Sequence, residues 1–452
     1  MGYINSISSI YLDVKRLTIN TADVKIYELN LKLCSEVRDL KVAIIGGSAA
    51  GLACAIELAK RKTGAQITVF EQNDRVGKKL LATGNGRCNL TNLSAGESGY
   101  RNMSFASYAL AEFSPTDNIS FFNSIGLYTK SDSCGRVYPL SNQATSVLDS
   151  LRFAAESLGV NMSVGVRVES VKKNGGKFKI NGGESFDFVV IATGGKAASS
   201  HGSDGSGYEI LRSLGHQITK LSPSLVQLET KSREFVKPLK GVRCETEMTL
   251  YLDSKLVCRK HGELLFADYG LSGIVSMEVS AYASPYLARG GKRAEVFADL
   301  VPSVEEKTLG AHLKSQAKAF PDKSVEDILS GFLPKKAGQA VMKAVGISLS
   351  KPAFTLPPEK FDSLARALKN VRFELSGTKD FSFAQVTSGG AATDEFEPKT
   401  MQSKRVGGLY CAGEVLDVDG DCGGYNLNWA WSSGRLAARS IAEKVVQNDK
   451  NK

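Results

Sequence analysis

The sequence lacks any long hydrophobic run, and this absence argues against a membrane-spanning helix. Its longest nearly uncharged apolar stretch lies between Lys41 and Glu57, has glycines in its middle, and is shorter than the ~20 residues that such a helix needs. Residues 1–40 contain early charges such as Asp13 and Lys15 and no continuous apolar segment, so they do not resemble a secretory signal. We therefore expect a cytoplasmic protein without a membrane partner.

Cysteine is scattered along the chain and forms no C-x-x-C pair. The eight cysteines stand at positions 34, 54, 88, 134, 244, 258, 411 and 422. This spacing argues against a zinc ribbon or a thioredoxin-type redox pair, and a chain without an export signal is expected to keep its thiols reduced. We predict no metal site.

Histidine is rare, and its positions do not combine with serine or cysteine into a nucleophile-and-base set. The four histidines are His201, His216, His261 and His312, and each is expected to be a surface or packing residue. If one of them acts as a catalytic base, His201 is the candidate, because it lies in the loop after a predicted strand that ends at 193–195.

The overall composition is typical of a globular protein with two or three domains. A chain of 452 residues exceeds the size of one hydrophobic core, and 42% of its residues are hydrophobic and 23% charged. The formal net charge of +10 could serve an anionic partner, either nucleic acid or a phosphorylated cofactor. Because lysine and arginine are dispersed, nucleic-acid binding is not favoured.

A strand, glycine turn, helix and second strand follow one another near the start of the chain. Residues 41–45 (KVAII) predict a buried strand, residues 46–51 (GGSAAG) a tight turn, and LACAIELAKR a helix. A second strand, QITVF at 66–70, ends at Glu71. This order predicts a dinucleotide-binding unit with an acid at the end of its second strand.

Later segments predict an insertion into this unit. EILRSLG predicts a helix that ends at Gly215, and the alternating segments from 217 to 300 predict antiparallel strands. Residues 302–348 have helical spacing, opening on a capping-box pattern from Ser303 to Glu306. A glycine-rich strand and loop resume at 386, so the dinucleotide unit is expected to be split.

The glycine turn has the chemistry of a diphosphate site. Main-chain amides at a helix N-terminus stabilise negative charge. In this turn, Gly46 permits the sharp bend of the chain, and Gly51 lets the following helix approach the strand. Ser48 stands at the middle position that is usually glycine, and it is small enough to crowd the diphosphate little. Glu71 is placed to accept hydrogen bonds from ribose hydroxyls and would repel a 2′-phosphate. The alternative is a plain glycine turn with a surface glutamate.

Two further glycine-rich stretches carry polar residues. Residues 77–92 (GKKLLATGNGRCNLTN) suit a loop around a diphosphate and a planar ring, although alone they could form a polar surface turn. Near the C-terminus, Glu414 or Asp417 would hold ribityl hydroxyls or, through water, the phosphate. The following helix, with Leu427 and Ala430 as small apolar neighbours, would present its N-terminus to the pyrimidine edge of a flavin.

These segments resemble the HI0933-like flavoprotein family, also called BaiN-like or NAD(P)/FAD-dependent oxidoreductases. The resemblance covers 41–445, and its most specific motifs are TGNGRCN at 83–89 and GGYNLNWA at 423–430. It implies an α/β fold: a glutathione-reductase-type, Rossmann-like FAD-binding domain interrupted by a β-barrel domain that carries a small helical domain. The predicted domains are an N-terminal extension 1–40, an FAD-binding domain 41–216 with 376–452, a barrel 217–301 with 349–375, and a helical domain 302–348.

The resemblance also implies one non-covalently bound FAD. With the motifs above, it predicts that the cofactor is surrounded by Gly46, Ser48, Ala49, Ala50, Gly51, Glu71, Gln72, Lys78, Lys79, Thr83, Gly84, Asn85, Arg87, Cys88, Asn89, Val168, Ala192, Thr193, Gly194, Gly195, Gly413, Glu414, Asp417, Gly424, Tyr425, Asn426 and Leu427. Cys88 is a further catalytic candidate as a thiol beside the ring, or simply a small packed residue. No second glycine-loop unit follows, so NAD(P)H would dock only transiently.

The function expected from this resemblance is FAD-dependent oxidation or reduction of a small organic substrate. Amine-oxidase-like and NAD(P)H-dependent reductase activities both stay open, because a flavin supplies the electron chemistry in either case. Two alternatives are a flavoprotein that acts on RNA or a protein partner, and a flavin-binding protein without turnover of its own. The sequence does not indicate the oligomeric state.

Overall fold

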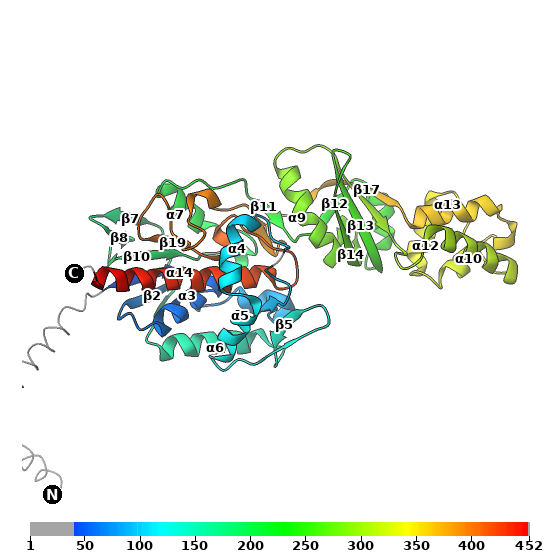
Figure 1. The fold of residues 1–452 in the computed structure, drawn as a ribbon. Coiled ribbons are helices and arrows are strands. Elements are labelled where there is room, and N and C mark those ends of the chain that lie inside the picture. The colour runs from blue at the N-terminus through cyan, green and yellow to red at the C-terminus, as the bar shows by residue number, and fades with distance from the viewer. Residues whose placement is uncertain (1–39, 97, 451–452) are drawn as a thin grey trace, which may run out of the picture.

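A parallel sheet forms the core of one end of the molecule. The computed structural model describes residues 40–96 and 98–450, and Figure 1 shows an elongated shape with this sheet at one end. The strand order is β19-β10-β1-β2-β6, and every neighbouring pair is parallel. The strands are β1 Lys41–Ile45, β2 Gln66–Glu71, β6 Asn161–Val164, β10 Phe188–Ile191 and β19 Leu409–Cys411. Their carboxyl ends therefore meet at one edge, where ligands bind in such folds.

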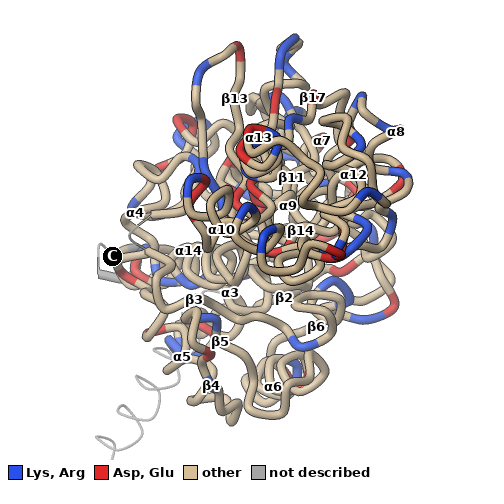
Figure 2. Tube along the Cα trace, turned by 90° about the vertical axis from the view of Figure 1, so that its right-hand side faces the viewer, with Lys and Arg blue, Asp and Glu red and all other residues tan. Residues whose placement is uncertain are grey.

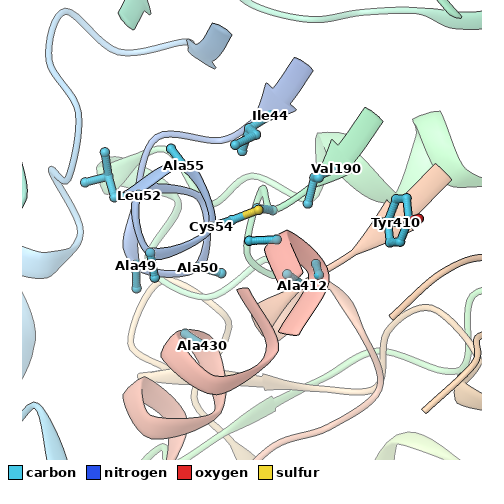
Figure 3. Close-up of a cluster of buried hydrophobic side chains, with 14 of the residues drawn as sticks. Ile44, Ala49, Ala50, Leu52, Cys54, Ala55, Val190, Tyr410, Ala412 and Ala430 are labelled. Carbon is cyan, nitrogen blue, oxygen red and sulfur yellow. The ribbon is translucent and has the colours of Figure 1, made fainter. Parts of the chain in front are cut away.

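Two helices that pack against each other cover this sheet. Helix α3 (Ala49–Lys60) packs against helix α14 (Tyr425–Lys450) (Figure 1). Helix α3 contacts β1 and β2, and α14 contacts β19. Nearly every residue of α3 is buried, and Cys54 lies among the apolar side chains between the helices and the strands (Figure 3). The predicted strand, turn, helix and strand at 41–71 are thus confirmed.

Shorter elements surround the sheet and its loops. Two three-stranded antiparallel sheets have the orders β3-β5-β4 and β7-β8-β9, and the pair β11 with β18 leads toward the second half of the molecule. Their bounds are β3 Thr91–Asn92, β4 Thr129–Ser131, β5 Arg136–Pro139, β7 Val171–Asn174, β8 Lys177–Ile180, β9 Ser185–Phe186, β11 Ser222–Ser224 and β18 Val386–Ser388. The helices here are α4 Met103–Glu112, α5 Pro115–Asn123, α6 Ala144–Ser157 and α7 Ser206–Ser213.

A closed antiparallel barrel follows, as the family resemblance implied. Its strand order is β12-β15-β14-β13-β16-β17. The strands are β12 Leu228–Thr230, β13 Arg243–Leu252, β14 Lys255–Ala267, β15 Gly270–Ser272, β16 Ala294–Asp299 and β17 Val371–Thr378, with the short helix α8 Arg233–Val236 beside them. Alternating burial along β13 places one face of the strand in the barrel core.

One helix inside the barrel segment was missed. Helix α9 (Ile274–Ala288) lies between the predicted alternating segments of 217–300, where no helix was expected, and it packs against β13 and β14. Val275, Val279 and Ala283 of α9 are fully buried with the barrel core. The helix is built largely from small and apolar residues without a clear polar face, so the sequence gives no helical periodicity to detect.

Four helices form the far end of the molecule (Figure 1). They are α10 Glu306–Ala319, α11 Val325–Leu329, α12 Lys335–Ala344 and α13 Pro358–Leu368. The capping box predicted from Ser303 to Glu306 is wrong, because α10 begins at Glu306. The preceding turn is held instead by Lys369, whose Nζ donates to the carbonyls of Val301 at 2.9 Å and Val304 at 2.6 Å. Helix α13 lies within 349–375, a segment assigned to the barrel, and the domain boundaries stay predictions.

No helix in the described part of the chain is long and apolar enough to cross a membrane. The described residues likewise contain no group of three or more histidine, cysteine or acidic side chains that could hold a metal ion.

A buried polar chain joins the segment after α7 to the loop before β19. The ring nitrogens of His216 lie 2.7 Å from Glu395 Oε2 and 2.9 Å from Ser403 Oγ, and Arg405 pairs with Glu395 at 2.6 Å. Although this resembles a serine, histidine and acid set, Ser403 Oγ already accepts the amides of Arg405 and Val406. The group is therefore a structural link, and His216 is a packing residue as expected.

The contact between α3 and the turn before it predicts the effect of a single methyl group. A Cβ on Gly51 would lie 1.9 Å from the carbonyl oxygen of Gly46, so Gly51→Ala must displace the helix or the turn. We expect a loss of stability of about 1–3 kcal/mol or more and loss of bound cofactor. Thermal unfolding and bound-flavin absorbance measure both. Gly331→Ala is the control, since its Cβ meets nothing closer than 3.7 Å, and equal behaviour of the two variants would contradict the packing argument.

The burial of His216 predicts a pH dependence of stability. Burial lowers the pKa of His216 below its ordinary 6.5, although Glu395 opposes the shift, so the folded protein holds this ring neutral. The unfolded chain takes up a proton as the pH falls through 6.5, and the folded chain does so only at lower pH, so stability decreases toward acid. Denaturant unfolding between pH 7 and pH 5 should show a steeper loss for the wild type than for His216→Asn. Equal slopes would refute this.

Candidate functional site

A cavity of about 460 Å³ opens at the carboxyl ends of the parallel strands. Its walls come from the turn after β1, the loop at 78–89, the segment after β10, and the N-terminal end of α14. Side chains near α9 and β18 close the opposite side. The cavity therefore lies between the sheet and the barrel elements, where topology brings distant loops together.

The turn after β1 presents main-chain amides to this cavity. Gly46 has a φ of 108°, and a Cβ there would lie 2.4 Å from the carbonyl oxygen of Ala192, so only glycine fits. Ser48 is the N-cap of α3 with an extended backbone and no side-chain cap, and Ala49 and Ala50 line the cavity. The amides of a first helical turn lack carbonyl partners within the helix, and they attract an anion such as a diphosphate.

Glu71 ties this turn to the end of β2. Its Oε2 accepts the amide of Gly47 at 3.0 Å, while Oε1 accepts the amide of Asn73 at 2.9 Å and its Nδ2 at 2.6 Å. The side chain is only 7% exposed and lines the cavity. Its carboxylate thus has a fixed orientation beside the amide-lined turn. A role toward a ribose stays a prediction.

An ion pair crosses the cavity wall between two predicted segments. Lys79 Nζ lies 2.9 Å from Glu414 Oε2 and 3.4 Å from Ser203 Oγ, and Glu414 Oε1 accepts the amide of Thr387 at 2.8 Å. Both charged groups line the cavity and are about one-fifth exposed at the side chain. The pair leaves this wall polar but electrically balanced.

The TGNGRCN loop places Asn89 in the cavity lining and Cys88 outside it. Asn89 lines the cavity, is buried, and its Oδ1 has no hydrogen-bond partner among the described residues. Cys88 is fully buried and lies outside the cavity lining, and burial raises its pKa to about 12. A thiol that keeps its proton at neutral pH fits packing better than a redox role.

The N-terminus of α14 faces the cavity from the other side. Gly424 precedes the helix with a φ of 107°, and a Cβ there would lie 2.5 Å from the carbonyl oxygen of Thr91. Asn426, Leu427 and Ala430 line the cavity from the first turns. The partial positive charge of this helix end therefore points at the same space as that of α3.

Most of the predicted cofactor residues line this one cavity. Those that do so are Gly46, Ser48, Ala49, Ala50, Glu71, Gln72, Lys78, Lys79, Thr83, Gly84, Asn85, Arg87, Asn89, Val168, Ala192, Thr193, Gly194, Gly413, Glu414, Gly424, Asn426 and Leu427. The catalytic candidate His201 also lines it, and its Nδ1 lies 3.2 Å from Ser200 Oγ.

Five predicted residues lie outside the cavity lining, and one of them needs a correction. Asp417 is turned toward Thr219 and Asn102, and burial raises its pKa, so it is not placed to hold ribityl hydroxyls or phosphate. The others support the walls from behind: Gly51, Cys88, Gly195 and Tyr425.

The sequence analysis missed the side of the cavity that comes from the second half of the fold. Its apolar members are Leu225, Ile274, Met277, Ala384 and Val386. Gln385, Asp421 and Cys422 also line the cavity and were missed, as were Arg136 and Tyr138, which come from β5 in the first half of the chain. Ala384, Gln385, Val386, Asp421 and Cys422 lie in segments that resemble the family, but no residue type among them indicated a place in the cavity. The long-range path of the chain brings all these residues together. Arg136 and Tyr138 offered one local signal, because residues two apart on a strand share a face.

Comparison with known proteins gives matches over nearly the whole described chain. Residues 40–440 match the family model described as HI0933-like protein Rossmann domain. The chain is 39% identical over 409 residues to 3-dehydro-bile acid delta(4,6)-reductase of Clostridium scindens, covering 89% of this chain and 99% of that protein. It is 31% identical over 422 residues to ribosomal RNA dihydrouridine synthase of Haemophilus influenzae, covering 89% and 98%. The protein of that name from Escherichia coli is 30% identical over 406 residues, covering 88% and 97%.

The position of Glu71 predicts weaker cofactor binding when its carboxylate is removed. Glu71→Ala removes the carboxylate that accepts a hydrogen bond from the Gly47 amide, and with it a hydrogen-bond acceptor beside the turn. We expect the affinity for FAD to fall by ~1–3 kcal/mol, the range for lost charged hydrogen bonds. Fluorescence titration of apoprotein with FAD measures this, with Glu169→Ala as a control because Glu169 lies outside the cavity. Unchanged affinity in Glu71→Ala would rule out the assigned role.

Proposed function

This chain belongs to the HI0933-like family of Rossmann-fold flavoproteins, and from that premise we propose a reductase function. The protein is an FAD-dependent oxidoreductase of a small molecule. We propose that it adds two hydrogens across a carbon–carbon double bond conjugated to a carbonyl group. The observation that carries this proposal is an apolar wall facing an amide-lined cofactor cavity.

The cavity residues fit a flavin dinucleotide. Two helix N-termini and the turn after β1 offer amides to negative groups, and the buried Asn89 Oδ1 has no partner among the described residues. The first turn of α3 would hold the diphosphate, Glu71 the adenosine ribose, and Glu414 with Lys79 the ribityl chain. The start of α14 and Asn89 would hold the pyrimidine side of the ring. When bound, the flavin supplies hydride transfer.

The names of the relatives support reduction of a conjugated double bond. The Clostridium scindens relative is named for reducing the 4,6 double bonds of a 3-dehydro compound, and the other two are named for making dihydrouridine. Each name describes a product with fewer double bonds. On chemical grounds, a ring double bond next to a 3-oxo group and the 5,6 double bond of uracil are both conjugated to a carbonyl group. Amine-oxidase-like chemistry, the other form of the prediction, has no such support from these names.

The chain's own residues would exclude water and supply a proton. Leu225, Met277 and Val386 form an apolar surface against which a ring or chain can pack, and packing there removes water from the reacting carbons. Tyr138 and His201 bring an O–H and an imidazole to the cavity, and either can deliver the proton that balances a transferred hydride.

Action on RNA is the second candidate function. The relatives named for ribosomal RNA and the net charge of +10 favour it. However, Figure 2 shows lysine and arginine interspersed with aspartate and glutamate rather than gathered into a continuous band. The apolar wall of the cavity also suits an apolar small molecule better than a nucleotide.

The reductase proposal predicts that a cyclic enone reoxidises the reduced protein without oxygen. The purified protein is reduced anaerobically with NADH or NADPH, or by light if neither reacts, and a cyclohexenone is added. We expect recovery of the oxidised flavin absorbance and a product two mass units heavier, because two hydrogens have been added. Free FAD reduced in the same way is the control.

Two results would contradict the reductase proposal. One is reduction of the oxidised flavin by amines with release of hydrogen peroxide, while no enone reacts. The other is reoxidation by ribosomal RNA alone, with dihydrouridine as the product, which would support the second candidate.

A further inference from the structure

Two arginines, Arg87 and Arg136, line the cavity. We propose that Arg87 and Arg136, with Tyr138 beside them, form a subsite for an oxyanion of the substrate, a carboxylate or a phosphate. The substrate is then amphipathic, with its charged group next to an apolar body. This inference rests on the proposed function, because it names the class of substrate that the same cavity takes.

Arg87 lies over the ring of Tyr138, and no hydrogen bond of its two terminal nitrogens occurs within the described chain. Its guanidinium carbon lies 4.7 Å from the ring centroid of Tyr138, and its Nε donates to the carbonyl of Gly84 at 3.4 Å. Among the described residues no carboxylate pairs with Arg87, which lines the cavity and is exposed. Stacking on an aromatic face orders a guanidinium while leaving its N–H groups free for a ligand.

Arg136 comes to the same place from strand β5. Arg136 and Tyr138 are two residues apart on β5 and both line the cavity, while Val137 between them is buried on the other face. Arg136 Nε donates to Asp132 Oδ2 at 2.8 Å, and no hydrogen bond of its two terminal nitrogens occurs within the described chain. Asp132 therefore orients the Arg136 side chain but leaves the two terminal nitrogens of its guanidinium group available to a ligand.

The carboxylate of Asp421, which also lines the cavity, is already paired with two cations. Asp421 lies 2.8 Å from both Arg101 and Lys260, so its negative charge is not available to the two cavity arginines. An incoming oxyanion thus meets two guanidinium groups against one carboxylate, Asp132. Charge-assisted and bidentate hydrogen bonds to guanidinium are among the strongest that a protein offers a carboxylate or phosphate.

The apolar wall begins directly beside Arg136. A Cβ on Gly423 would lie 3.6 Å from Arg136 Cδ, so the arginine stem packs on the turn before α14. The preceding residue, Cys422, packs against the buried cluster that contains Leu225 and Val386. An oxyanion on the arginines therefore places the rest of a ligand on the apolar wall, and this adjacency favours an amphipathic substrate over a neutral one.

The inference is tested by binding rather than by turnover. FAD-loaded protein is titrated calorimetrically with octanoate, octyl phosphate and octanamide, which share one apolar chain. We expect octanoate or octyl phosphate, or both, to bind about tenfold more tightly than octanamide, and the stronger of the two identifies the oxyanion. Arg87→Gln and Arg136→Gln should each weaken anion binding about tenfold and change octanamide binding less than twofold. Arg136→Lys keeps the positive charge but not the planar guanidinium group, and its affinity for the anions should lie between those of the wild type and Arg136→Gln.

Arg152→Gln is the matched control, because Arg152 lies on α6 outside the cavity and should leave all three affinities unchanged. Equal affinities for the anions and the amide would overturn the inference. The inference would also be overturned if Arg87→Gln and Arg136→Gln altered the flavin absorbance or reduction potential but left the preference for anions unchanged. The arginines would then serve the cofactor. If enones fail to react but the anion preference holds, the proposed function fails and this subsite stands.

Discussion

The close approach of helix α3 to the end of β1 is the constraint on which the site depends. Gly51 sits against the carbonyl of Gly46 with no room for a Cβ, and a Cβ on Gly434 of α14 would lie 2.4 Å from the carbonyl oxygen of Ala50. The two contacts fix α3 between the sheet and α14. The first turn of α3 consequently has one possible position, with its amides at the edge of the cavity where the parallel strands end.

The second helix is fixed by a buried polar network. Asn428 of α14 accepts hydrogen bonds from Thr91 Oγ1 at 2.8 Å and Asn118 Nδ2 at 2.9 Å, and Tyr100 Oη donates to the carbonyl of Tyr425 at 2.9 Å. Because unpaired polar groups in a core are costly, this network permits one register of α14. The positive ends of α3 and α14 therefore face a single space, and one elongated anionic cofactor can use both.

The half of the site that is built from residues close together in the sequence could be predicted. The turn from Gly46 to Gly51 and the acid at Glu71 could be predicted because a diphosphate site needs small residues and amides at fixed spacing. Helix α9 could not, since it lacks a polar face. Asp417 was misplaced because neighbours distant in sequence decide where its carboxylate points. Arg136 had no motif at all, and its meeting with Arg87 is a product of the chain's long-range path.

The assignment of FAD depends on the main-chain amides of the turn after β1 and of the first turn of α3, which are expected to bind the diphosphate. Amide hydrogen exchange of the peptide containing residues 46–50 tests this directly, with apoprotein compared in the presence of FAD and of riboflavin, which has the ring but no diphosphate. The account predicts strong protection of these amides by FAD and little by riboflavin. Equal exchange with and without FAD, or equal protection by both ligands, would contradict it.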